Sequence, residues 1–186
     1  ITYNAAISAC EKGQQWQGAL ALVGEARFHS LAPDIITYSA AVSACEKCGR
    51  WEHALALVKD MHCRGLTCDV VLYNAAVSAC EKGRQWQRAL ALAKEMRQHD
   101  IAPDVITASA LISACWKGAQ WELALGLFCE MRKEGVVPDV FTYNAAISAS
   151  EQGQRWEGAL QLMEDMRSAG LEPIVMTYNA AISACE

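Results

Sequence analysis

Apolar residues recur at helical spacing in two segments of each repeated stretch of this chain. In the first segment, Tyr3, Ile7 and Cys10 stand at positions i, i+4 and i+7, with small alanines between them. The second segment begins near Trp16 and continues to about Arg27 with the pattern Trp-x-x-Ala-Leu-x-Leu-Val. Spacings of three and four residues place these side chains on one face of an α-helix. Because no stretch shows the apolar and polar alternation of a β-strand, the pattern predicts an all-α protein.

Both helical segments return with a period of 35 residues. The motif Thr-Tyr-Asn-Ala-Ala-Ile-Ser-Ala-Cys-Glu-Lys-Gly begins at Thr2 and recurs with substitutions but without insertion or loss. A fixed period of this size predicts a stacked array in which each unit contacts only its neighbours. We therefore expect an α-solenoid of helix-turn-helix repeats that fills residues 1–186 as a single array. Its units are 1–34, 35–69, 70–104, 105–139 and 140–174, with a partial unit at 175–186.

The ends of the chain fall inside repeats. Residue 1 lies one position into a unit, and residues 175–186 cover only the first third of another. Solenoids need end repeats with a polar outer face for solubility. We therefore expect the chain to be a segment of a longer protein.

Glycine and tryptophan mark the joints between the predicted helices. Glycines end both helices, and those after the first helix predict a left-handed C-terminal cap at Gly13, Gly83, Gly118 and Gly153. A tryptophan begins the second helix of each of the five repeats, at Trp16, Trp51, Trp86, Trp121 and Trp156. Tryptophan can stack on a nucleic-acid base, but its recurrence at an apolar helical position favours core packing.

Charge and cysteine content limit the partners and the chemistry of the chain. The formal net charge of −5 argues against strong non-specific binding to nucleic acid, which usually requires a basic face. Five of the nine cysteines share one repeat position: Cys10, Cys45, Cys80, Cys115 and Cys185. Packed helices lie about 8–10 Å apart, too far for neighbouring members to form a disulfide, so we expect reduced core thiols. No run of 18 apolar residues occurs, and no membrane span is expected.

Metal and catalytic sites are not expected from the motifs. Cys45 and Cys48 form a Cys-x-x-Cys motif, but no second ligand pair follows at a suitable spacing. His62, Cys63 and Cys68 form a weaker cluster in a turn that has lost its proline. No deaminase-like, nuclease-like or phosphate-binding motif is present. The sequence therefore predicts no enzyme activity in this segment, no cofactor and no metal.

The repeat resembles the pentatricopeptide repeat. The 35-residue period, the Thr-Tyr-Asn opening, the Ala-Leu-x-Leu second helix and the Pro-Asp close carry the resemblance over all 186 residues. The tetratricopeptide repeat differs, because its period is 34 and its Trp-Leu-Gly-Tyr first helix is missing here. The resemblance implies a right-handed superhelix that binds single-stranded RNA at one base per repeat.

The same resemblance implies a place of action and a second possible role. It implies an organelle, mitochondrion or chloroplast, and a part in RNA processing, stability or translation. The alternative is a scaffold subunit that contacts proteins or ribosomal RNA in a large organellar complex.

In the family, the residue after the tyrosine and the last residue of the repeat choose the base. Here the pairs are Asn4 with Asp34, Ser39 with Asp69, Asn74 with Asp104, and Ser109 with Asp139. Asn with Asp implies uracil and Ser with Asp implies guanine, so the implied site is 5′-UGUG-3′. The fifth repeat departs from this pattern, because Ile174 stands where Asn144 should meet an acid.

Two further columns have implied roles. Each base is wedged between apolar residues at Ile1, Ile36, Val71, Ile106, Phe141 and Met176. Phosphate is met by a basic residue at the end of the first helix, at Lys12, Lys47, Lys82 and Lys117. Simple packing is an equal alternative for the wedge column, and solvated helix-end charge is an equal alternative for the lysines, since glutamates adjoin most of them.

Overall fold

The computed structural model describes residues 2–29, 31 and 33–185, and over these residues the chain is helical without strands. Each repeat contributes a first and a second helix, joined by a short turn. The helices are α1 (Thr2–Lys12), α2 (Trp16–Phe28), α3 (Ile35–Lys47), α4 (Trp51–Cys63), α5 (Val70–Lys82), α6 (Trp86–Gln98), α7 (Val105–Lys117), α8 (Trp121–Lys133), α9 (Val140–Gln152), α10 (Trp156–Ser168) and α11 (Val175–Ser183).

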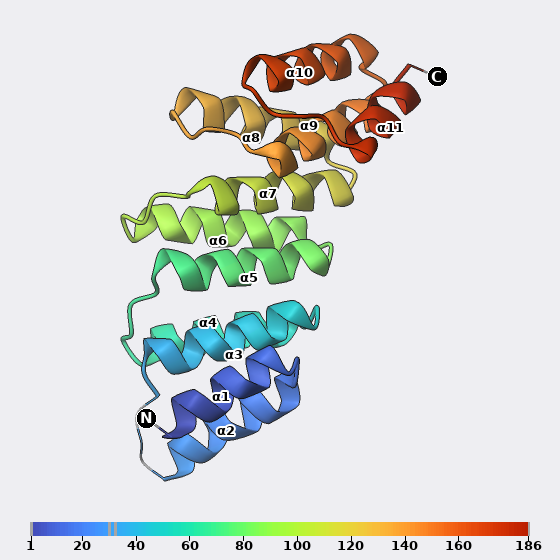
Figure 1. Cartoon of the computed structure of the whole chain (residues 1–186). Helices are drawn as coiled ribbons and strands as arrows, with labels where there is room; N and C mark the ends of the chain where they lie inside the picture. The colour runs from blue at the N-terminus through green and yellow to red at the C-terminus, as the bar shows by residue number, and fades with distance from the viewer. Residues whose placement is uncertain (1, 30, 32, 186) are drawn as a thin grey trace.

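The repeats stack in chain order, so the two termini lie at opposite ends of an elongated molecule (Figure 1). The first helices α1, α3, α5, α7, α9 and α11 form one row in which each packs against the next. Each second helix packs against the first helix of its own repeat and that of the following one. The predicted all-α solenoid of stacked helix-turn-helix repeats is confirmed.

An aspartate at the end of each of the first four repeats starts the first helix of the next. Asp34, Asp69, Asp104 and Asp139 are the N-caps of α3, α5, α7 and α9. In each case Oδ1 accepts a hydrogen bond from the backbone N–H three residues later, at 2.8–2.9 Å. This satisfies one of the free donors at the helix start. Ile174, at the start of α11, has no side-chain acceptor and forms no such bond.

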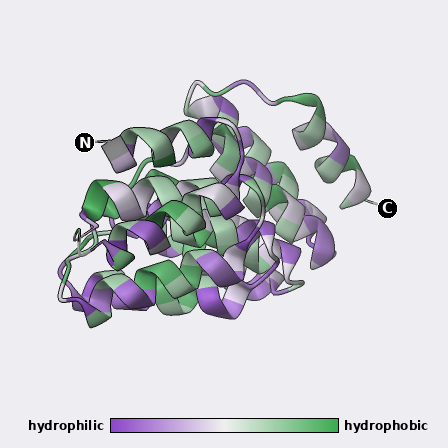
Figure 2. Ribbon diagram, turned by 90° about the horizontal axis from the view of Figure 1, so that it is seen from below, coloured by the Kyte–Doolittle hydropathy of each residue, from purple (hydrophilic) through white to green (hydrophobic). Residues whose placement is uncertain are grey.

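Small residues let the first helices approach closely. In the second and third repeats the tyrosine, two alanines and the thiol of the motif are fully buried: Tyr38, Ala41, Ala44, Cys45, Tyr73, Ala76, Ala79 and Cys80. Burial raises the pKa of the Cys45 and Cys80 thiols to about 11, so they stay protonated. All nine cysteines are free thiols. Figure 2 shows that the helices carry hydrophobic and hydrophilic residues together. A stack of helix pairs requires this, because each helix packs against its neighbours on one side and meets solvent on the other.

The glycines after the first helices serve a purpose other than the predicted one. The residue with a positive φ is the one that follows this glycine: Gln14, Arg84, Ala119 or Gln154. Only the second repeat has a glycine at that following position, Gly49. Gly83 instead has φ −79° and lies against the Trp51 ring of the preceding repeat. A Cβ on Gly83 would stand 2.3 Å from Trp51 Cδ1. The left-handed cap prediction for these glycines was therefore wrong.

The tryptophans pack between repeats, as the sequence favoured. Trp51, Trp86 and Trp121 are half-buried, and each contacts the glycine that ends the first helix of the following repeat. Arginines cover the outer faces of some rings, as Arg88 does for Trp51 at 5.9 Å. This close contact explains why a side chain is excluded at the glycine.

Replacing Gly83 by alanine tests this contact. The added methyl group must displace Trp51, and overpacking of this kind costs roughly 1–3 kcal/mol. The matched control is Gly126→Ala, in the middle of α8, where a Cβ meets nothing within 4 Å. The control should gain roughly 0.5–1 kcal/mol because alanine restricts the unfolded chain. Urea unfolding followed by circular dichroism measures both, and equal shifts in the two variants would contradict the tryptophan contact.

Candidate functional site

The predicted wedge residues form an exposed apolar column along the row of first helices. Each is the second residue of its helix, and each is at least half exposed: Ile36 60%, Val71 62%, Ile106 58%, Phe141 71% and Met176 50%. Ile1 lies outside the described residues. Simple packing does not account for these side chains, because the protein leaves most of their surface in solvent. An exposed apolar column on a regular spacing is typical of a binding surface.

The structure joins the predicted Asn and Asp partners, which lie near the start and at the end of the same repeat. Asn74 Nδ2 donates to Asp104 Oδ2 at 2.9 Å and Oδ1 at 3.2 Å, and Asn4 Nδ2 lies 3.2 Å from both Asp34 oxygens. The hydroxyl of Thr107 donates to Asn74 Oδ1, so both ends of the Asn74 amide are held. This network positions the amide through the last residue of its own repeat and a threonine of the following one.

The serine positions are held less tightly. The Ser109 and Thr142 hydroxyls are hydrogen-bonded at 2.5 Å, and Ser109 lies 3.5 Å from Asp139 Oδ1. Among the described residues, Ser39 makes no hydrogen bond to Asp69, although both line one cavity. The third repeat has Leu72 where the other repeats have threonine, so no hydroxyl bridges the two residues.

Asn144 shows the consequence of having Ile174 instead of an aspartate at the end of the fifth repeat. Its Oδ1 accepts from Thr177 at 2.5 Å, but its Nδ2 has no hydrogen-bond partner in the part of the chain that the structure describes. The residue is only 2% exposed. A buried donor without a partner costs about 1–3 kcal/mol. The departure predicted for the fifth repeat therefore leaves an amide N–H unsatisfied on this face.

Hydrogen bonds hold two of the reader aspartates, Asp34 and Asp104, as carboxylates. The Thr37 backbone N–H lowers the pKa of Asp34, with further bonds from the Thr37 hydroxyl and the Asn4 amide. Burial alone would raise the pKa of Asp104, but hydrogen bonds from Thr107 and Asn74 outweigh it and leave the pKa below its usual value. A negative acceptor thus lies beside Asn4 and beside Asn74.

Two cavities open on this face, and each contains the predicted wedge and reader residues together. One of about 360 Å³ is lined by Ile36, Val71, Ser39 and Asp69. The other, of about 540 Å³, is lined by the predicted readers Ser109, Asp139 and Asn144 and by the predicted wedge residues Ile106, Phe141 and Met176. Each cavity therefore places polar hydrogen-bonding groups between apolar side chains.

Three of the four predicted phosphate lysines, all but Lys12, are engaged in ion pairs between repeats. Lys47 lies 2.8 Å from Glu11, and the same pairing joins Lys82 to Glu46 and Lys117 to Glu81, both at 2.5 Å. The next pair would join positions 116 and 152. Both have changed together there, to Trp116 and Gln152. The phosphate role stays a prediction, and it requires the lysine to exchange a carboxylate for a phosphate.

A serine column that the sequence prediction missed completes this face. Ser43, Ser78 and Ser113 each donate to the glutamate of the preceding repeat, at 2.9–3.2 Å. Ser8, Ser43, Ser113 and Ser148 line the two cavities. The signal was available in the sequence, because this serine follows the reader by four residues, a spacing that shares a helix face.

Replacing Ile174 by aspartate should supply both missing interactions. The carboxylate would cap α11 and accept from Asn144 Nδ2, which together stabilise by about 1–2 kcal/mol. Amide exchange in α11 should then slow by about 5–30-fold. The control Ile174→Ala provides no acceptor and should not slow exchange. If both variants exchange alike, the orphaned amide is not a site of lost stability.

Solved structures with the same stacked architecture are pentatricopeptide repeat proteins. The complex of the pentatricopeptide repeat protein PPR10 with an 18-nt psaJ RNA element matches with a TM-score of 0.78 and 29% identity, over 96% of this chain and 26% of PPR10. A second structure, of PPR10 from maize, matches with a TM-score of 0.71 and 30% identity, over 98% of this chain and 26% of PPR10. The chain thus spans about a quarter of the length of PPR10.

A more distant structure shares the fold alone. The PPR domain of Arabidopsis thaliana protein-only RNase P 1, in complex with tRNA, matches with a TM-score of 0.84 at 14% identity, over 96% of this chain and 94% of that domain. A comparison with curated protein sequences found no match.

Sequence profiles of the family cover most of the chain. The PPR repeat family profile matches residues 68–117 and 103–152, and the PPR repeat profile matches residues 1–29, 36–66 and 141–171. With the 35-residue period and the stacked helix pairs, these matches lead to one assignment: the chain belongs to the pentatricopeptide repeat family.

Proposed function

We propose that this chain binds single-stranded RNA along the row of first helices, one base per repeat, with a preference near 5′-UGUG-3′. The observation that carries the proposal is the coincidence of cavity, wedge and reader residues where two repeats meet. The cavity at Ser39 and Asp69 lies between Ile36 and Val71, which belong to successive repeats. A base is an aromatic ring with a polar edge, and this cavity offers apolar walls with polar groups between them.

Wedging by the apolar column provides affinity without choosing a base. Stacking a base on a side chain contributes roughly 1–3 kcal/mol and tolerates any base. Association itself costs about 4–15 kcal/mol. Five repeats are therefore close to the minimum for detectable binding.

Reading of the base edge uses donors and acceptors that the fold leaves available. The N-cap bond of each reader aspartate uses Oδ1, and Asp139 Oδ2 receives no bond from the described residues. A carboxylate oxygen there can accept the N–H groups of a guanine edge. Serine is smaller than asparagine and leaves more room for a purine. At Asn74, the second N–H of the amide can donate to a uracil carbonyl.

The PPR10 complex supports the ligand class, because that relative is solved with an RNA element. The organellar compartment and a role in RNA processing, stability or translation enter the proposal from the family resemblance. We propose binding and no catalysis for this segment. The competing proposal is a scaffold role, which the ion-paired lysines favour, since paired lysines attract phosphate less strongly.

The test is a titration of the protein with a short RNA that contains UGUG and with an ACAC control at low salt. Tighter binding to UGUG is expected. Ser39→Asn should then move the preference at the second base from guanine towards uracil, by about 5–150-fold for a discrimination of about 1–3 kcal/mol.

Ser168→Asn is the matched control, because it makes the same change at an exposed position at the end of α10, away from the reader column. It should leave selectivity as in the wild type. Equal binding of the two RNAs would contradict the reader assignment and favour the scaffold role.

A further inference from the structure

A ladder of ion pairs links the second helices of neighbouring repeats. Arg27 pairs with Asp60, Arg97 with Glu130 at 3.1 Å, and Arg132 with Asp165 at 2.7 Å. Each pair joins one repeat to the next through residues 33 positions apart. The second repeat breaks the ladder, because His62 stands at the arginine position and places Nδ1 3.1 Å from Glu95 Oε1. An imidazole lacks the permanent charge of a guanidinium, so this is the weak step of the ladder.

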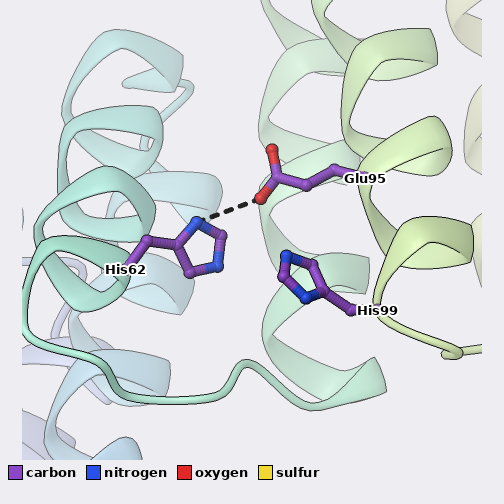
Figure 3. Close-up of side chains that lie close together, drawn as sticks. All are labelled: His62, Glu95 and His99. Atoms are coloured by element: carbon purple, nitrogen blue, oxygen red, sulfur yellow. Dashed lines mark ion pairs between the residues drawn. The ribbon is translucent and has the colours of Figure 1, made fainter.

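Two more departures from the repeat meet at the same place. Cys68 stands at the position where the other four repeats carry a proline, and its Sγ lies 3.1 Å from His62 Nε2. His99 follows Glu95 by four residues at the end of α6, and the rings of His62 and His99 are 5.5 Å apart between centroids. Figure 3 shows His62 and the pair Glu95 and His99 directed towards one another from α4 and α6.

The geometry is that of a metal site that is nearly closed. The ligand atoms of His62, Glu95 and His99 all lie within 4.8 Å of one another. A tetrahedral zinc ion with bonds of about 2.0–2.1 Å separates its ligand atoms by roughly 3.3 Å, so small side-chain rotations close the site. An open cavity of about 470 Å³ is lined by His62, Cys68, His99 and Ile101, which gives an ion access and leaves room for water.

We propose that His62, Glu95 and His99 bind a divalent transition metal, with Zn²⁺ the best fit, and that the ion ties the second repeat to the third. Two imidazoles and one carboxylate are a common zinc ligand set, which leaves a fourth position for water. His62 binds through Nδ1, since its Nε2 faces the Cys68 thiol. That contact fixes the ring orientation in the way that partners of metal-bound histidines do.

The ion would add a bond that the fold otherwise lacks. Among the described residues, α4 and α6 do not pack directly against each other, and their repeats are joined mainly through the first helices. A metal bridge would hold the outer row at a fixed spacing. It does not involve the RNA-binding face, so it stands or falls independently of the proposed function.

The test is Zn²⁺ titration of the metal-free protein by calorimetry, together with thermal unfolding. We expect one ion per chain and a rise in Tm of roughly 5–10 °C at a hundredfold excess over Kd. His62→Arg restores the residue of the other repeats and keeps Glu95 paired, so the variant should fold. It should bind Zn²⁺ at least about tenfold more weakly and lose the Tm shift.

The controls separate this site from the thiols. His62→Arg retains all nine cysteines, so binding through thiols would persist in it. His29→Ala removes the histidine at the position of His99 in the first repeat and should behave as wild type. Equal Zn²⁺ affinity in wild type and His62→Arg, or no Tm shift in the wild type, would overturn the proposal and leave His62 as an ion-pair partner of Glu95.

Discussion

The aspartate carboxylate that ends each of the first four repeats makes the interactions on which the array depends. One Asp104 side chain holds the amide of Asn74 in its own repeat, and it also caps α7 and binds the buried hydroxyl of Thr107 in the following repeat. A single helix pair buries too little surface to offset the entropy of ordering its backbone, so each repeat needs its neighbours. This aspartate starts a helix and fixes the boundary between two repeats with the same group.

Building and the proposed reading therefore share residues. An asparagine that would offer an N–H to a base is oriented by the aspartate that ends its own repeat and by the threonine of the next, so the proposed binding face is preorganised without ligand. The cost appears where the aspartate is lost: Ile174 leaves α11 without a side-chain cap and Asn144 Nδ2 without a partner. A change of reader residue is then also a change in how two repeats are joined.

The repeat period made the fold predictable, because stacking follows from regular spacing and the helix ends follow from Asp, Gly and Pro. The wedge and reader columns were also predictable as positions. Contacts between repeats were not, since they join residues 30–36 positions apart. Gly83 faces a tryptophan of the preceding repeat, and Lys47 pairs with Glu11 instead of the adjacent Glu46. The cluster around His62 was missed for the same reason: Glu95 and His99 come from the next repeat.

A double-mutant cycle between Asn74 and Asp104 tests most directly whether the reader column also joins the repeats. The free energy of unfolding is measured for the wild type, Asn74→Ala, Asp104→Ala and the double variant. The account predicts that the losses are not additive, with an interaction energy of about 0.5–3 kcal/mol, because each residue is the partner of the other. Additive losses within about 0.3–0.5 kcal/mol would show that the pair does not hold the repeats together.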